Sequence, residues 1–182
     1  MTRRVATPRQ RPASGEPRKR GRLLSTAAAV AVFVVAWAAL LQNDAAMAGI
    51  QRAFAVVTSA VLGLLGRGTI AEGTAVLSDQ FGISVVTACT GLFATGLFVL
   101  AVLVFPATWR ARLAGCGVGV CVLFVVNVVR LVSLYYIGVY WPEVLDVAHQ
   151  VVWQSLVIAI VVAMWLLWAG LASPRRRREG ET

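Results

Sequence analysis

Charged side chains are scarce in this sequence, and acidic ones are the scarcest. Only 14% of the 182 residues are charged, with 17 Lys and Arg against 8 Asp and Glu, whereas 59% are hydrophobic. A water-soluble domain of this size has charged residues at about a quarter of its positions. The apolar residues also gather into runs long enough to cross a bilayer. The composition therefore excludes an ordinary soluble domain and predicts a polytopic membrane protein with small aqueous parts.

Residues that bind metals or act as nucleophiles are also few. The chain has one histidine, His149, and three cysteines, Cys89, Cys116 and Cys121. A single histidine cannot form the ligand cluster of a typical zinc protease. The sequence also has no Ser/His/Asp motif and no glycine-rich phosphate-binding loop. We therefore expect no metal and no cofactor.

The excess of cations gives a formal net charge of +9, but the cations do not form one face. Eight lie within residues 3–22, four form Arg175–Arg178, and Arg110 and Arg112 stand between apolar runs. Basic clusters beside membrane spans are typical topology signals. We therefore expect the partner of these cations to be the lipid bilayer and expect no nucleic-acid partner.

Four apolar runs have the length that a membrane-spanning helix needs, about 20 residues. They are residues 23–41, 81–105, 113–136 and 151–171. A proline-rich basic arm, residues 1–22, precedes them and is predicted to be disordered in the cytoplasm. A basic cytoplasmic tail, residues 173–182, follows. We expect an all-α fold with a single membrane domain over residues 23–172.

A further segment, residues 46–66, has apolar residues spaced by three or four, with Gln51, Arg52 and Thr58 between them. This is the pattern of an amphipathic helix. If the segment does not span, both termini lie on one side, together with 14 of the 17 cations, as the positive-inside rule favours. We therefore expect an interfacial or re-entrant helix on the outer face. Whether it spans the membrane stays open.

The predicted topology places both termini in the cytoplasm and residues 43–83 on the outer face. Within that outer segment, Thr74–Leu77 and Phe81–Val86 flank the polar residues 78–80. β-branched residues on both sides of a polar turn predict a short β-hairpin. The all-α fold is thus expected to carry one small β element outside the membrane.

Three chemically active residues fall near the outer ends of the predicted spans, although they are far apart in the sequence. They are Cys89, Arg130 and His149. An arginine inside an apolar run costs about 2.5–3.5 kcal/mol, so we expect Arg130 to face the protein interior. Asn127 lies one turn earlier on the same helical face. Together they predict a polar notch that suits a carboxylate or a developing oxyanion.

Cys89 and His149 fit the chemistry of a thiol nucleophile and its general base. If Thr87 caps a helix, Cys89 lies in the first turn, where the helix dipole favours a thiolate and free N–H groups can bind an oxyanion. Cys116 and Cys121 lie deeper, and we expect them to pack as small hydrophobic residues without a disulfide to Cys89. Each active residue also has a structural interpretation: a buried Cys, a snorkelling Arg and an interfacial His.

At these positions the sequence resembles the exosortase/archaeosortase family of membrane cysteine transpeptidases. The matching pieces are Cys-Thr-Gly-Leu at 89–92, Asn-Val-Val-Arg at 127–130, and His149 at the start of the last span. The resemblance covers residues 45–170, and the size is most similar to the short, exosortase H-like members. Thr90 departs from the pattern, because many members have Ser there.

The resemblance implies a membrane protease or transpeptidase that cleaves C-terminal sorting signals of exported proteins. Such a signal has a short motif, a transmembrane segment and a basic tail. It implies Cys89 as nucleophile, His149 as base, Arg130 as stabiliser of the carbonyl or intermediate and Asn127 as a supporting residue, with the site on the extracytoplasmic side of the cell membrane. Two alternatives stay open: a non-enzymatic membrane assembly subunit, and a small transporter that uses Arg130 as a binding charge. The substrate motif, the acceptor and the oligomeric state also stay open.

Overall fold

The computed structural model describes residues 16–173. The predicted basic arm up to residue 15 and the basic tail from residue 174 lie outside the described residues. The helices are α1 Glu16–Leu41, α2 Asp44–Leu64, α3 Leu92–Val104, α4 Trp109–Tyr140, α5 Leu145–Val147 and α6 Trp153–Ala172. Three short strands, β1 Ile70–Glu72, β2 Ala75–Leu77 and β3 Gly82–Ser84, precede α3. Three short helical segments complete the order: the 3₁₀ turns η1 Thr87–Thr90 and η2 Pro142–Val144, and the π-helical η3 Ala148–Val152.

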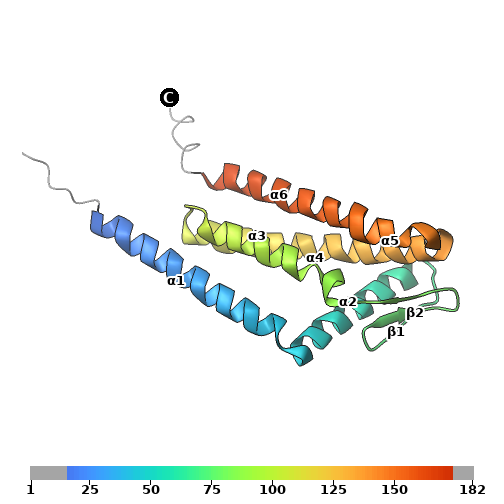
Figure 1. Ribbon diagram of the computed structural model, residues 1–182. Coiled ribbons are helices and arrows are strands. Elements are labelled where there is room, and N and C mark those ends of the chain that lie inside the picture. The colour runs from blue at the N-terminus through green and yellow to red at the C-terminus, as the bar shows by residue number, and fades with distance from the viewer. Residues whose placement is uncertain (1–15, 174–182) are drawn as a thin grey trace, which may run out of the picture.

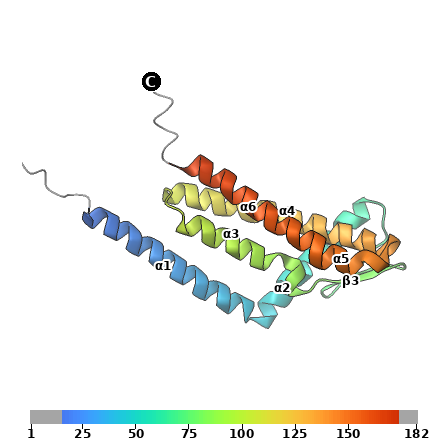
Figure 2. The ribbon, with the colours of Figure 1, turned by 45° about the horizontal axis from the view of Figure 1, so that its top comes forward.

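The helices form an elongated bundle with a small sheet at one end (Figure 1). α3, α4 and α6 lie side by side in both ribbon views, and α1 lies along α3 (Figures 1 and 2). α2 runs obliquely across the end of the bundle that carries the sheet, η1 and α5. We call this the sheet end. The first residues of α1 and the last of α6 both lie at the opposite end, on either side of α3 and α4 (Figure 1).

The all-α polytopic fold predicted from the sequence is confirmed. Four helical segments are long and apolar enough to cross a membrane, and they are Leu23–Leu41, Asp44–Leu64, Trp109–Tyr140 and Pro142–Ala172. α1 begins at Glu16, so the helix starts seven residues before the predicted span. The segment predicted as an amphipathic outer helix is α2, which is long and apolar enough to cross and is about one-third buried.

The prediction of one span over residues 81–105 is wrong. Helix α3 begins only at Leu92 and has 13 residues, because residues 82–84 form β3 and residues 87–90 form the turn η1. Gly91 separates the turn from the helix with a left-handed φ of 66°. Glycine adopts this conformation without the Cβ clash that other residues meet. The change of direction here places Cys89 in a turn rather than in a helix.

The predicted hairpin is confirmed, and a third strand joins it. β2 pairs antiparallel with β3, with Val76 opposite Ile83, and β1 pairs with the other side of β2. The Ser78 side chain holds the β2–β3 turn by donating to the Phe81 carbonyl at 2.9 Å. Tyr135 of α4 in turn donates to the Ser78 oxygen at 2.8 Å. The sheet is therefore fastened to α4.

Two hydrophobic clusters stabilise the structure. The cluster at the sheet end joins α2, β2, η1 and α4. It includes Phe54, Leu62, Val76, Val85, Cys89, Leu131 and Tyr135. The second lies between α3, α4 and α6 and includes Phe98, Val102, Leu123, Val157 and Val161. At the opposite end, the buried Arg112 donates to the Phe105 carbonyl and to the Thr26 hydroxyl. Arg112 thus ties α1 to the α3–α4 connection.

Candidate active site

Cys89 lies in η1, a four-residue 3₁₀ turn that is stabilised by hydrogen bonds within the turn and to the residue before it. The Thr90 hydroxyl donates to the Thr87 carbonyl at 2.7 Å, and the Cys89 N–H donates to the Val86 carbonyl at 2.8 Å. Thr87 makes no capping hydrogen bond, so the predicted cap is wrong. Because its N–H is already paired, Cys89 does not offer that donor to an oxyanion. The donor must come from elsewhere.

Two amide side chains hold η1, one from α2 and one from α4. Gln51 of α2 donates from Nε2 to the Thr87 hydroxyl at 3.1 Å. Asn127 of α4 is 2% exposed and donates from Nδ2 to the Cys89 carbonyl. A Cβ at Gly91 would lie 2.9 Å from the Asn127 Oδ1 atom, so the turn and Asn127 pack in direct contact. This packing fixes the position of the cysteine backbone.

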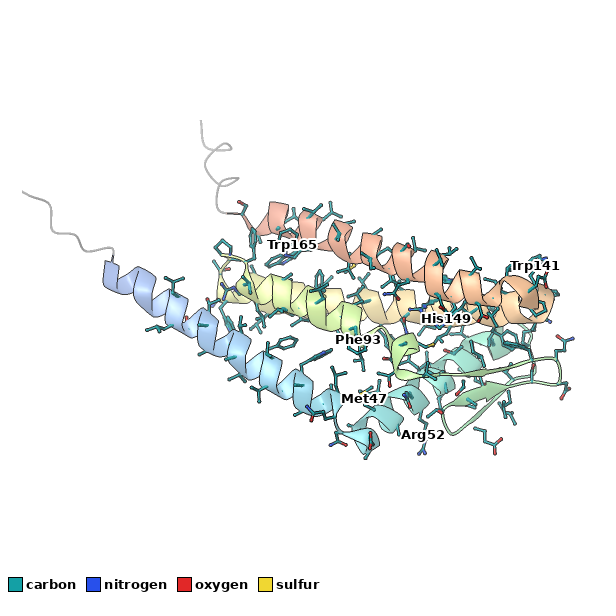
Figure 3. The ribbon with its side chains drawn as sticks, viewed as in Figure 1. Met47, Arg52, Phe93, Trp141, His149 and Trp165 are labelled. Carbon is teal, nitrogen blue, oxygen red and sulfur yellow. The ribbon has the colours of Figure 1, made fainter. Side chains whose placement is uncertain are left out.

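His149 lies beside this turn. Its Nε2 atom is 3.3 Å from the Sγ atom of Cys89, across 60 positions of sequence. His149 belongs to the π-helical η3, which inserts a wider turn between α5 and α6. Such turns frequently occur at functional sites because they displace side chains from the regular helical spacing. Figure 3 shows His149 next to the start of α3, where Phe93 is labelled.

Arg130 completes the cluster from α4. Its side chain is 3% exposed, and its Nη2 atom donates to the His149 carbonyl at 3.4 Å. Within the described part of the chain, the buried Nε atom has no hydrogen-bond partner. A buried guanidinium N–H without a partner is costly unless a ligand pairs with it. Arg130 therefore presents a donor to the interior rather than reaching toward an interface.

Cys89 is buried, with 4% of the residue exposed. It lies in η1, ahead of α3, and burial raises the pKa of the thiol above its ordinary value. A backbone hydrogen bond at Val86 and the positive charge of Arg130 lower that pKa and oppose the effect of burial. The expectation that the helix dipole favours a thiolate is therefore wrong, because Cys89 lies outside α3 and desolvation dominates. A base is needed to remove the proton.

The other two cysteines lie outside the cluster, and all three thiols are free. Cys116 packs at the edge of the second hydrophobic cluster. Cys121 is exposed, so its predicted packing role is wrong. The difference follows from the face of α4 on which each residue lies. Among the described residues, no three His, Cys, Asp or Glu side chains gather where they could hold a metal ion.

Sequence reasoning missed two supporting contacts at the sheet end. Gln51 was interpreted only as an interruption of an apolar helix. Arg67 follows α2 and donates to the Tyr140 hydroxyl, and its guanidinium lies 5.0 Å from the centre of the Tyr136 ring. These contacts raise the pKa of Arg67 and join the α2–β1 connection to the end of α4. No local signal marks either contact, because both depend on tertiary packing.

Residues 17–169 match the family model described as "Transmembrane exosortase (Exosortase_EpsH)". The matched range contains Cys89, Asn127, Arg130 and His149. No curated protein and no solved structure matches the chain.

Proposed function

Because the chain belongs to the transmembrane exosortase family, we propose that it cleaves C-terminal sorting signals of exported proteins by cysteine chemistry. The family consists of membrane enzymes that process such signals. The observation that carries the proposal is the 3.3 Å separation between the Cys89 Sγ and His149 Nε2 atoms. A thiol within hydrogen-bond reach of an imidazole is the arrangement of an activated cysteine nucleophile.

The reaction begins with transfer of the Cys89 proton to His149. The thiolate attacks the scissile carbonyl, and the C–N bond breaks as a thioester forms between Sγ and the upstream part of the substrate. His149 returns the proton to the leaving amine. A water molecule or an acceptor nucleophile then attacks the thioester and releases Cys89. Hydrolysis and transfer share every step up to formation of the thioester and differ only in the nucleophile that attacks it.

Arg130 supplies the donor for the developing oxyanion. Its buried Nε atom has no partner among the described residues, whereas the Cys89 N–H is paired with Val86. A preorganised donor in a site without bulk water stabilises charge far more than one in water. Asn127 acts as a positioning residue, because it bonds the Cys89 carbonyl and not the reacting atoms.

We place the site on the extracytoplasmic side of the cell membrane, with both termini in the cytoplasm. The cation clusters at 3–22, 110–112 and 175–178 support this orientation by the positive-inside rule. The start of α4, which contains Arg112, and both ends of the described chain lie at the end of the bundle opposite the sheet (Figure 1). An exported substrate then meets Cys89 with its transmembrane segment still in the bilayer and its basic tail in the cytoplasm.

The test is processing of a candidate substrate from the same genome, one that ends in a motif, an apolar span and basic residues. Mass spectrometry of its new C-terminus, with and without this protein, identifies the bond that is cut. We expect Cys89→Ala to abolish the cut at equal protein abundance, whereas the exposed-thiol control Cys121→Ala retains it. Normal processing by Cys89→Ala would instead favour the assembly-subunit or transporter alternative.

A further inference from the structure

Strand β3 is an edge strand, and its register shows which backbone groups face outward. The strands are ordered β1-β2-β3, so only β2 pairs with β3. Val85 donates to the Thr74 carbonyl, and Ser78 donates to the Phe81 carbonyl. In an antiparallel pair, hydrogen-bonded and non-hydrogen-bonded positions alternate. The N–H and C=O groups of Gly82 and Ser84 therefore point away from β2.

These outward groups have no partner in the described part of the chain. Gly82 and Ser84 are both exposed, and neither backbone makes a hydrogen bond to another element. Open sheet edges do not occur against lipid, because each unpaired backbone group there costs several kcal/mol. The edge must therefore face water or a polypeptide. An unpaired edge is also the template on which an extended chain can add a strand.

The open edge leads directly to the nucleophile. Ser84 ends β3, and Cys89 follows five residues later in η1. An extended chain advances about 3.3 Å per residue. A peptide paired with β3 therefore needs only a few further residues to bring a carbonyl to the Cys89 thiol. Edge and thiol belong to one continuous segment held by Gln51 and Asn127.

We propose that the open edge of β3 binds the substrate as an added strand, through the residues just upstream of the scissile bond. This inference rests on the proposed function and extends it to the mode of substrate recognition. The occupant is an extended peptide segment, recognised by backbone hydrogen bonds to Gly82 and Ser84. Main-chain pairing selects an extended conformation and leaves sequence selection to the side chains.

The direction of the added strand follows from the fold. β3 runs toward η1, and α3 then continues into the bundle away from the sheet (Figure 1). The substrate's apolar segment follows its scissile bond and must lie in the bilayer beside the helices. Only a substrate strand parallel to β3 enters from the sheet end and continues in that direction. An antiparallel strand would direct the apolar segment away from the bundle.

Proline scanning of the two sheet edges tests the inference. Ser84→Pro removes an outward N–H that makes no bond within residues 16–173, and proline is tolerated on edge strands. Ala71→Pro is the matched control, because the β1–β2 register directs the Ala71 N–H outward from the opposite edge. We expect Ser84→Pro to lower the processing rate about tenfold at limiting substrate. Ala71→Pro should remain near the wild-type rate.

A crosslinking measurement keeps the inference testable if Ser84→Pro does not fold. A photoreactive residue is placed at position 84 or 71 in the Cys89→Ala protein, which should retain uncleaved substrate. Crosslinks to the substrate from 84 and not from 71 support strand addition. Retained substrate with no crosslink from 84, or a crosslink from 84 to a second copy of this chain, overturns it and leaves the cysteine mechanism intact. Continued cleavage by Cys89→Ala overturns the proposed function itself.

Discussion

Asn127 and Arg130, one turn apart on the same face of α4, each donate to the main-chain carbonyl of a different residue of the candidate site. Asn127 bonds the Cys89 carbonyl, and Arg130 bonds the His149 carbonyl. One helix therefore sets the distance between a turn that precedes α3 and a turn that precedes α6. The thiol–imidazole pair depends on α4 for its alignment as well as for the donor that Arg130 offers.

Arg130→Lys is expected to restore little of the activity that Arg130→Ala loses. The planar guanidinium of Arg130 bonds the His149 carbonyl through Nη2 and keeps its Nε–H available for the substrate. The single ammonium group of lysine cannot do both. Loss of one oxyanion donor lowers kcat about 10²–10³-fold. The measurement is kcat and KM for substrate cleavage, with Arg112→Lys, at the other buried arginine, as the control. A Lys variant with wild-type kcat would show that charge alone is sufficient.

Gly91→Ala is expected to disturb η1 while the bundle stays folded. Alanine at a left-handed φ costs about 1–2 kcal/mol, and its Cβ would press on Asn127. Cleavage should fall strongly, with little change in membrane abundance or resistance to proteolysis. Gly117→Ala is the control, because a Cβ there meets no atom within 4 Å. Equal activity in the two variants would contradict a fixed turn.

Alkylation of Cys89 should depend on His149. Burial raises the pKa of the thiol, so the thiolate fraction at neutral pH is lower than for an ordinary thiol and grows as the pH rises. With Cys116 and Cys121 changed to Ala, the labelling rate should increase toward alkaline pH. At neutral pH the labelling rate should be lower in the His149→Ala variant than in the protein with His149, because the variant lacks the base. A rate that is insensitive to both pH and His149 would argue against a working pair.

Reporter fusions test the proposed topology. Reporters at Gly15, Thr108 and Gly180 should read cytoplasmic, and one at Asp79 should read outside. The reason is the positive-inside distribution of the 17 cations. A Thr108 reporter that reads outside would show that both α2 and α3 cross the membrane, which makes five spans.

The grouping of the three candidate site residues could be predicted from the sequence, because the topology determines how deep in the membrane each residue lies. Once the spans are placed, Cys89, Arg130 and His149 fall at the same end of the bundle, and the cost of a charge in an apolar run predicts the burial of Arg130. The geometry brings all three together. Their roles in catalysis stay predictions.

The start of α3 at Leu92 could not be predicted in the same way. Residues 81–86 are apolar and β-branched, and this composition suits a strand or a buried helix equally. The confirmed hairpin shows that the strand was the correct assignment of these residues, and the turn at Gly91 delays the helix to Leu92. The short β1 and the Gln51–Thr87 hydrogen bond were missed because both depend on tertiary packing.

The shortness of α3 affects the bilayer as well as the protein. Its 13 residues extend about 20 Å, whereas the hydrocarbon core is about 30 Å thick. The cysteine turn therefore begins about 10 Å short of the level that a full-length span would reach, and the surrounding lipid must adapt to a hydrophobic mismatch. In the proposed reaction, a substrate helix of full length beside α3 must unwind about two turns to meet the thiol. The depth of a peptide bond in the membrane then helps to determine which bond is cut.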